Sequence, residues 1–299
     1  ATYVSGSGSS MLVFQYTIQT GENDSDGISI GADALALNNA ILSDPIGFPA
    51  IITHSAVSAN GSFMVDAMAP PVISFTLSDT ALKIGDNATV ILVFAEAVVS
   101  FSSSDDIMVS SGSLDNMTSP NNIVWTGTFT PTPNTEVATN TLSLGTNYTD
   151  TAGNTGAAAT TANYEVETLA PTISGVVISS ATGIQNNFVN AGDVVSVTAT
   201  FSESVIVDSA SGTPTFTLVV GSTNRTATYV SGSGSTPLVF QYTIQAGDND
   251  SNGISIGTNA ISLNSGTIRD VAGNNATLTH SSVGDNLNYK VDAILPTLD

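Results

Sequence analysis

Short apolar runs alternate with polar positions along most of the chain, and turn residues separate the runs. Two runs are rich in β-branched residues, 89–94 (TVILVF) and 195–201 (VSVTATF), and a Gly-Asp pair precedes each of them. Alternation of this kind predicts half-buried β-strands. No segment of twelve or more residues holds a 3.6-residue apolar period between capping residues, so we expect negligible helix.

The sequence repeats itself at a distance of 226 residues. Residues 1–66 align without a gap to residues 227–292 and agree at about 39 of the 66 positions, which is typical of repeat proteins. The strings ATYVSGSGS and LVFQYTIQ each occur twice, once in each copy. We therefore expect the chain to open in the middle of a domain and to be part of a longer polypeptide.

Three junctions share a second pattern, in which an acidic residue, a short spacer and a proline follow one another at 66–70, 167–171 and 292–296. Proline fixes φ and cannot donate to a β-ladder, so it marks a linker or a strand start. An immunoglobulin-like domain needs roughly 100 residues. The sequence predicts an all-β fold of tandem immunoglobulin-like antiparallel β-sandwich domains in a linear array. The predicted units are a partial domain at 1–66, complete domains at 67–169 and 170–292, and a linker or start of a further domain at 293–299.

Charge and composition narrow the range of partners. The chain has 25 acidic residues against 4 basic ones, a formal net charge of −21. Such a surface repels nucleic acid and anionic membranes and attracts cations. There is no cysteine, which excludes disulfides, thiolate zinc sites and thiol nucleophiles. No apolar run approaches the ~18 residues of a membrane span, so no membrane insertion is expected in this segment.

Strand direction predicts which acidic residues meet. In a seven-strand sandwich the second and sixth strands end at the pole where the preceding linker enters. Glu96 closes the second strand of the first complete domain, and Asp150 and Asn154 follow its sixth, so all three are expected beside Asp66. Oxygen ligands with a glycine turn favour Ca²⁺ over zinc or copper. The alternative is that these acids are solvated loop ends. The corresponding set predicted at the next junction is Glu165, Glu167, Glu203, Asp270 and Asn274.

A second candidate for Ca²⁺ is a loop that resembles the start of an EF-hand. Its oxygen donors in the last domain are Asp248, Asp250 and Asn252, and the repeat places Asp24 and Asp26 in the corresponding loop. The closing glutamate of the motif is absent and no helices flank the loop. A plain turn rich in Asn, Asp and Gly is the alternative interpretation.

The motifs follow one another in a characteristic order: a proline before the first strand, Gly-Asp before the second, Phe-x-Glu after it, Asp-x-Ala-Gly-Asn, and a closing strand that ends in Val-Asp or Val-Glu. This order resembles the bacterial immunoglobulin-like repeats of large surface adhesins, including biofilm-associated and RTX-adhesin extender domains. The resemblance covers nearly the whole chain. It implies an extracellular stalk at the cell surface that Ca²⁺ stiffens. The segment 1–66 departs from the motif order, with Asp44-Pro45-Ile46-Gly47-Phe48 in place of Asp-x-Ala-Gly-Asn.

The favoured function is therefore that of a structural extender whose partners are neighbouring repeats of the same chain, together with copies associated laterally or end to end. One alternative is a ligand-binding module for glycans or proteins. Another is a filament subunit that a neighbouring chain completes. An enzyme is not expected, because each repeat copy contains a single histidine, His54 or His280, and the residues form no catalytic constellation.

Overall fold

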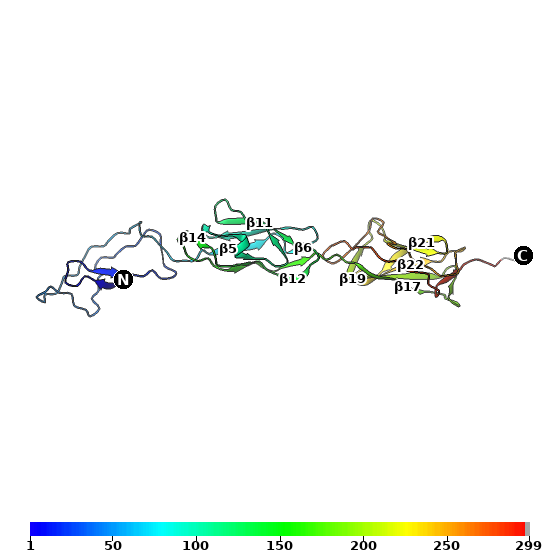
Figure 1. Cartoon of the computed structure of the whole chain (residues 1–299), viewed down its shortest axis with the longest axis horizontal. Helices are drawn as coiled ribbons and strands as arrows, with labels where there is room; N and C mark the ends of the chain where they lie inside the picture. Colours follow the sequence, from blue (N-terminus) through cyan, green and yellow to red (C-terminus); the bar gives the residue numbers. More distant parts are fainter. Residues whose placement is uncertain (297–299) are drawn as a thin grey trace.

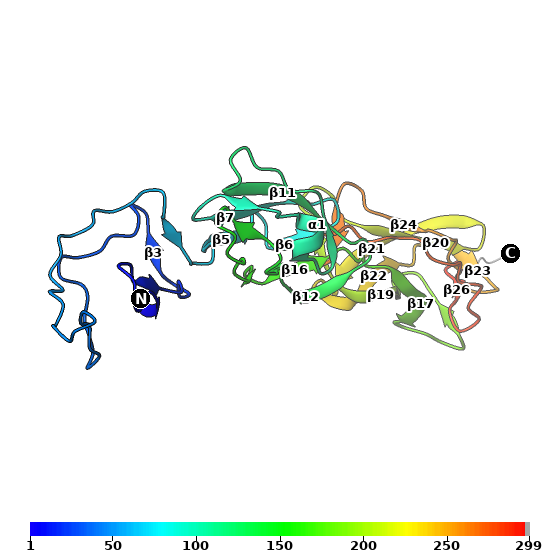
Figure 2. The same cartoon turned by 60° about the vertical axis from the view of Figure 1, so that its left-hand side comes forward.

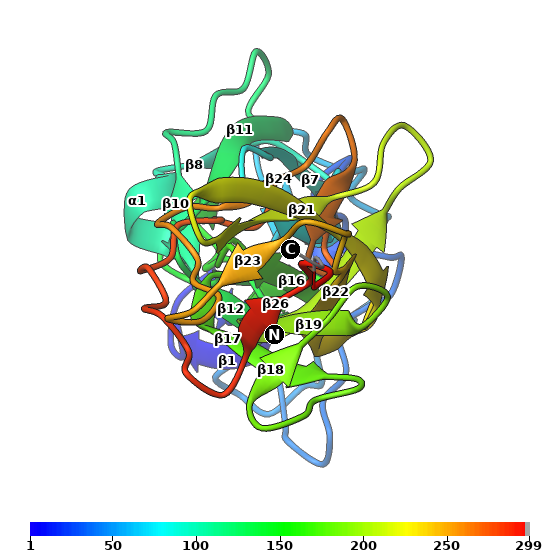
Figure 3. The same cartoon turned by 90° about the vertical axis from the view of Figure 1, so that its right-hand side faces the viewer.

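A computed structural model describes residues 1–296 of the chain. It shows three units in a row, with the N-terminus in the first (Figure 1). The described residues are almost entirely strands and turns; the single helix among them is the four-residue α1, Ser103–Asp106. The all-β fold and the low helix content predicted from the sequence are confirmed. Viewed along the long axis, the units lie one behind another (Figure 3).

The middle unit has a core built by strict alternation. In β7 (Ala88–Phe94) the residues Val90 and Leu92 are fully buried, whereas the residues between them face outward. The strand lies centrally in a four-stranded sheet of order β10-β11-β7-β5, and a second sheet, β12-β16-β6, contributes Tyr164 and Val166 to the same core. The strands of this unit are β5 (Val72–Leu77), β6 (Ala81–Lys83), β7, β8 (Val98–Val99), β9 (Ile107–Met108), β10 (Gly112–Leu114), β11 (Val124–Pro131), β12 (Glu136–Asn140), β13 (Ser143–Leu144), β14 (Thr149–Asp150), β15 (Ala159–Thr160) and β16 (Tyr164–Glu167).

The third unit follows the same plan with a larger sheet. Its order is β17-β19-β22-β21-β20-β24, with β25 also paired to β19, and a small sheet β18-β26-β23 lies at the far end. Phe216 and Phe240 meet edge to face in the core, with ring centroids 5.2 Å apart. The strands of this unit are β17 (Ile173–Ala181), β18 (Phe188–Val189), β19 (Val194–Asp208), β20 (Thr215–Val220), β21 (Thr223–Ser231), β22 (Ser235–Thr243), β23 (Asn249–Asp250), β24 (Ile261–Ser262), β25 (Thr267–Arg269) and β26 (Lys290–Asp292).

Residues 1–66 form an open arrangement of loops around two short strand pairs (Figure 2). The strands are β1 (Thr2–Ser5), β2 (Val13–Gln15), β3 (Asn23–Asp24) and β4 (Val65–Asp66). Their pairing reproduces the third unit at the repeat distance, since Tyr3 pairs with Phe14 as Tyr229 pairs with Phe240. This unit therefore has the local structure of the second half of the third one.

Two strand pairs correct the expectation of purely antiparallel sheets. β6 runs parallel to β16, and β18 runs parallel to β26. In the middle and third units the chain passes from the first sheet to a second one soon after the first strand, and it then runs in the same direction as the closing strand. The boundaries predicted at 66/67, 169/170 and 292/293 stay predictions, and the last three residues of the 293–299 linker lie outside the described part of the chain.

Candidate cation site at the domain junctions

The first junction brings three acidic side chains together. Asp66 comes from the end of β4, Glu96 from the bend after β7, and Asp150 from the end of β14. One carboxylate oxygen of each lies within 4.8 Å of the others. Within residues 1–296, this is the single group of three or more acidic or histidine side chains with such spacing. The convergence expected from strand direction is therefore present here.

Asp150 is held in place by the loop that follows it. Its side chain is 1 % exposed, and its Oδ1 accepts hydrogen bonds from the backbone N–H groups of Ala152 and Asn154, both at 2.9 Å. Gly153 occupies the turn with φ +94°, a left-handed conformation that suits glycine. Burial alone would raise the pKa of Asp150, but the hydrogen bonds from Asn154, Gly153 and Ala152 outweigh it, and the pKa lies below its usual value. Asp150 is thus a preorganised carboxylate.

The pKa of Glu96 shifts in the opposite direction to that of Asp150. Its half-buried carboxyl accepts no hydrogen bond from the described residues, and its pKa is raised by burial first and then by the charges of Asp66 and Asp150. Two unit charges at 4.8 Å repel by roughly 1 to 3 kcal/mol, between the dielectric of water and an effective value near 20. A cation among the three acids would convert this repulsion into attraction.

The spacing of the triad allows three oxygens to contact one ion. Ca²⁺ binds oxygen at about 2.3–2.6 Å, so two ligands on opposite sides of the ion are separated by about twice that distance. Oxygens that all lie within 4.8 Å of one another can contact one such ion together. The donor set consists of carboxylates alone, which suits a hard cation.

Asn154 contacts the acids with its amide nitrogen. Nδ2 donates to Asp150 Oδ2 at 2.8 Å and to the backbone oxygen of Asp66 at 3.1 Å. The second bond connects the middle unit to the preceding linker. The residue predicted as a metal ligand therefore lies beside the acids as a hydrogen-bond donor.

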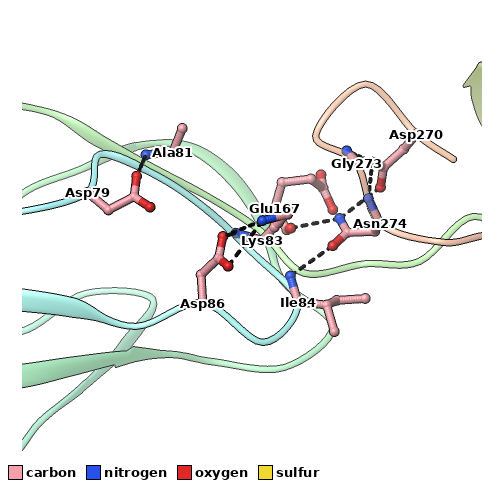
Figure 4. Close-up of polar contacts among 9 residues, drawn as sticks. All are labelled: Asp79, Ala81, Lys83, Ile84, Asp86, Glu167, Asp270, Gly273 and Asn274. Atoms are coloured by element: carbon pink, nitrogen blue, oxygen red, sulfur yellow. Dashed lines mark hydrogen bonds and ion pairs between the residues drawn. The ribbon is translucent and has the colours of Figure 1, made fainter.

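The second junction repeats this connection with other residues (Figure 4). Asn274 Nδ2 donates to Asp270 Oδ2 at 2.8 Å and to the backbone oxygen of Glu167 at 2.9 Å. Its Oδ1 accepts a hydrogen bond from the backbone N–H of Ile84 at 2.8 Å. Both amide atoms of Asn274 are therefore used between units, and neither is free to bind a metal in this geometry.

The acids of the second junction are close enough to influence one another. Burial raises the pKa of Glu203, and the charges of Asp270 and Glu167 raise it further. The pKa of Glu167 is also raised, mainly by burial and then by Glu136 and Asp270, against one hydrogen bond from the N–H of Leu169. Unlike the first triad, these carboxylates do not come within 4.8 Å of one another as a group of three in the described structure.

Glu136 was missed by the sequence reasoning. It begins β12 and pairs across the sheet with Glu167. The turn at 131–135 is the sequence feature that could have indicated it. This turn lies directly before β12, whose first residue, Glu136, is opposite Glu167, the last residue of β16. Glu165, which was predicted at this junction, is exposed on β16.

The EF-hand-like loops form hydrogen bonds typical of a turn. Asp250 is 3 % exposed and accepts hydrogen bonds from the backbone N–H groups of Gly221 at 2.7 Å and Gly253 at 2.8 Å. The side chain of Asn252 donates to Asp285 at 2.5 Å. In the repeat copy, Asp24 Oδ1 accepts from the N–H of Gly27 at 2.9 Å. Asp26 is exposed.

Asp248 is buried and forms an ion pair with the half-buried Arg225. Its carboxylate contacts the guanidinium of Arg225 and accepts the hydroxyl hydrogen of Tyr242 at 2.6 Å. Burial raises the pKa of Asp248, but the bonds from Tyr242, Gln245 and Arg225 lower it below its usual value. These contacts favour the turn interpretation, and calcium binding at both loops stays a prediction that the geometry does not support.

The comparison with protein families agrees with the all-β fold. Residues 66–166 match the family described as "Bacterial Ig-like domain". A solved structure, described as "FdeC, a Novel Broadly Conserved Escherichia coli Adhesin Eliciting Protection against Urinary Tract Infections", is 15 % identical and aligns over 82 % of this chain and 71 % of its own, with a TM-score of 0.34. A likeness at this TM-score carries no argument about function. No curated protein matches the sequence. Within residues 66–166, the chain contains a bacterial immunoglobulin-like domain, which confirms the resemblance predicted from its motifs.

Proposed function

We propose that this chain is an extender segment of an extracellular surface protein, in which Ca²⁺ at the domain junctions limits bending between neighbouring domains. The observation that carries the proposal is the triad of Asp66, Glu96 and Asp150, which joins a linker to the domain that follows it. A bacterial immunoglobulin-like domain at residues 66–166, the arrangement of the units in a row and the strongly acidic composition support it. No enzymatic activity is assigned.

Cation binding would act on the hinge and not on the cores. The hydrophobic core of the middle unit contains none of the three acids, so a cation at the triad would act on the linker contact. The linker residue Asp66 is held to the middle unit by hydrogen bonds from Asn154. A cation would add attraction at the same point and restrict how residues 1–66 turn relative to the middle unit. Its affinity is expected in the 10⁻⁴–10⁻³ M class of extracellular modules.

The test is small-angle X-ray scattering of the chain with Ca²⁺ and with a chelator. With Ca²⁺, we expect the chain to sample a narrower range of maximum dimensions and cross-sections, because the linker bends less. In the variant Glu96→Gln/Asp66→Asn this response should disappear, whereas the variant Asp105→Asn, which changes an exposed acid on α1 away from the junction, should respond like the parent chain. An identical response in both variants would refute a role for the triad.

Scattering measured with magnesium or sodium at matched ionic strength distinguishes a specific Ca²⁺ site from general charge screening. General screening lowers repulsion with any salt, on the scale of the Debye length. A site of the proposed kind responds to Ca²⁺ at concentrations at which sodium has no effect. An equal effect of Ca²⁺ and sodium at equal ionic strength would refute the proposal.

A further inference from the structure

The chain contains asparagine followed by glycine at two places, 60–61 and 252–253. The backbone nitrogen of such a glycine can attack the side-chain amide carbon of the asparagine, because glycine has no Cβ in the way and its backbone turns freely. The attack has two requirements. The N–H of the glycine must be free of hydrogen bonds, and the asparagine side chain must lie over the peptide that follows it. The two pairs differ in both respects.

Asn60 meets both requirements. It is exposed, as is Gly61, and the N–H of Gly61 donates to no acceptor within residues 1–296. The Oδ1 atom of Asn60 accepts a hydrogen bond from the N–H of Ser62 at 3.1 Å. This Asx turn folds the side chain back over the Gly61 peptide. The same hydrogen bond stabilises the negative charge that develops on Oδ1 when the amide carbon is attacked.

Asn252 meets neither requirement. The N–H of the buried Gly253 donates to Oδ1 of Asp250 at 2.8 Å. The side-chain Nδ2 of Asn252 donates to Asp285 at 2.5 Å, which holds the amide in another direction. Before it can attack, the nitrogen of Gly253 must give up a hydrogen bond to a charged group. That loss slows the reaction roughly 10-fold to 150-fold, the rate equivalent of about 1.5–3 kcal/mol.

A third asparagine isolates the effect of the following residue. Asn286 is the counterpart of Asn60 at the repeat distance. Its Oδ1 accepts a hydrogen bond from the N–H of Asn288 at 3.1 Å, the same contact at the same length as in the first copy. The next residue is Leu287, whose side chain hinders closure of a ring. Asn286 therefore has the turn without the glycine, and Asn252 has the glycine without the turn.

From these contacts we infer that Asn60 is a site of spontaneous deamidation, a modification that needs water as its only co-reactant. A bond forms between the nitrogen of Gly61 and Cγ of Asn60. The side-chain nitrogen leaves as ammonia and carries away the proton of the Gly61 N–H, so that a succinimide ring remains. Water then adds to either ring carbonyl and opens the ring to aspartate or isoaspartate. This inference depends neither on Ca²⁺ nor on the proposed function.

The modification would change a tightly packed turn. The carbonyl oxygen of Asn60 accepts a hydrogen bond from the N–H of Phe63 at 2.8 Å. It also lies so close to Gly27 that a Cβ at that position would be 2.0 Å away. Isoaspartate inserts an extra methylene into the backbone, and this contact leaves no room for the displaced chain. The hydrogen bond from the N–H of Ile28 to the oxygen of Phe63, 3.1 Å long, should therefore open more often, with faster hydrogen exchange at Ile28.

The test follows the three asparagines together in the 299-residue chain. The folded chain is incubated at neutral pH and digested, and mass spectrometry detects the replacement of NH₂ by OH. We expect Asn60 to convert at least about tenfold faster than Asn286 and roughly 10-fold to 150-fold faster than Asn252. In the chain unfolded in guanidinium chloride, Asn60 and Asn252 should convert at similar rates, because each then precedes a glycine with a free N–H. A rate at Asn60 in the folded chain equal to either of the others would overturn the inference.

Matched variants exchange the following residue between the two copies. Gly61→Leu should lower the rate at Asn60 to that of Asn286, and the position accepts a side chain because a Cβ there would meet only the backbone oxygen of Asp26, at 3.9 Å. Leu287→Gly, at a position that is 62 % exposed, should raise the rate at Asn286 to that of Asn60. Conversion of Asn60 at the parent rate in Gly61→Leu would refute attack by the nitrogen of residue 61.

Discussion

Asn274→Ala tests whether the last two units are coupled by protein contacts. The side chain of Asn274 is 3 % exposed and makes three hydrogen bonds, to Asp270, to the backbone of Glu167 and from the backbone of Ile84. The last two cross the junction. A neutral hydrogen bond contributes about 0.5–1.5 kcal/mol net, and one to a charged group about 1.5–3 kcal/mol. The substitution should therefore cost about 1–3 kcal/mol of coupling between units and a similar amount within the third unit.

The assay reads the coupling directly at one amide. The N–H of Ile84 belongs to the middle unit, but its hydrogen-bond acceptor belongs to the third. A loss of 1–3 kcal/mol corresponds to about 5-fold to 150-fold faster hydrogen exchange at Ile84. Exchange at Val90 and Leu92, which lie in the buried strand β7, should not change.

Asn275→Ala is the matched control. Asn275 is the next residue along the chain, and its side chain accepts one exposed hydrogen bond from Arg269 at 2.9 Å. It makes no contact across the junction in the described structure, so exchange at Ile84 should stay at the parent rate. Equal rates at Ile84 in Asn274→Ala, Asn275→Ala and the parent chain would refute the view that Asn274 couples the two units.

Three further outcomes follow from the same structure. Because folding raises the pKa of Glu96, its contribution to stability is present below the unfolded pKa and is lost as the pH rises through the folded pKa. Without divalent cations, Glu96→Gln should therefore stabilise the chain at pH 7 and remove that part of the pH dependence in urea titrations. A lower stability of the variant at pH 7 would contradict the proposed repulsion. Arg225→Met should destabilise the third unit by about 2–3 kcal/mol because it leaves the carboxylate of Asp248 buried without its cation, while Arg269→Met, at an exposed site, should cost less than about 0.5 kcal/mol in the same calorimetric scan. Phe240→Ala should cost about 3–5 kcal/mol in chemical denaturation and its repeat counterpart Phe14→Ala below about 1 kcal/mol, so similar losses would show that residues 1–66 already bury Phe14.

The sequence was sufficient to predict the fold because the apolar alternation is regular. Val90 and Leu92 in β7, and Val195 and Val197 in β19, are buried on the side that the pattern indicates. It was not sufficient to predict the parallel strand pairs. Which sheet a short strand joins depends on where the chain crosses between layers, and that crossing has no periodic signal.

The candidate site was predictable to the extent that strand direction determines it. Asp66, Glu96 and Asp150 meet because strand ends at one pole of a sandwich are close in space. The role of Asn274 was not predictable, because asparagine offers both an acceptor and donors, and the choice depends on Ile84 in another unit. The sequence also predicted Asp248 as a metal ligand, because its actual partner, Arg225, lies 23 residues away in the chain and the loop itself gives no sign of it.

The parallel pairs β6–β16 and β18–β26 determine how a unit responds to traction. When a chain is pulled from its two ends, the early strand is drawn toward one pole and the closing strand toward the other. Because the two run side by side in the same direction, their ladder bonds are sheared together and do not open one after another. A unit built in this way resists extension through several bonds at once, and its resistance resides in the protein backbone and does not require an ion.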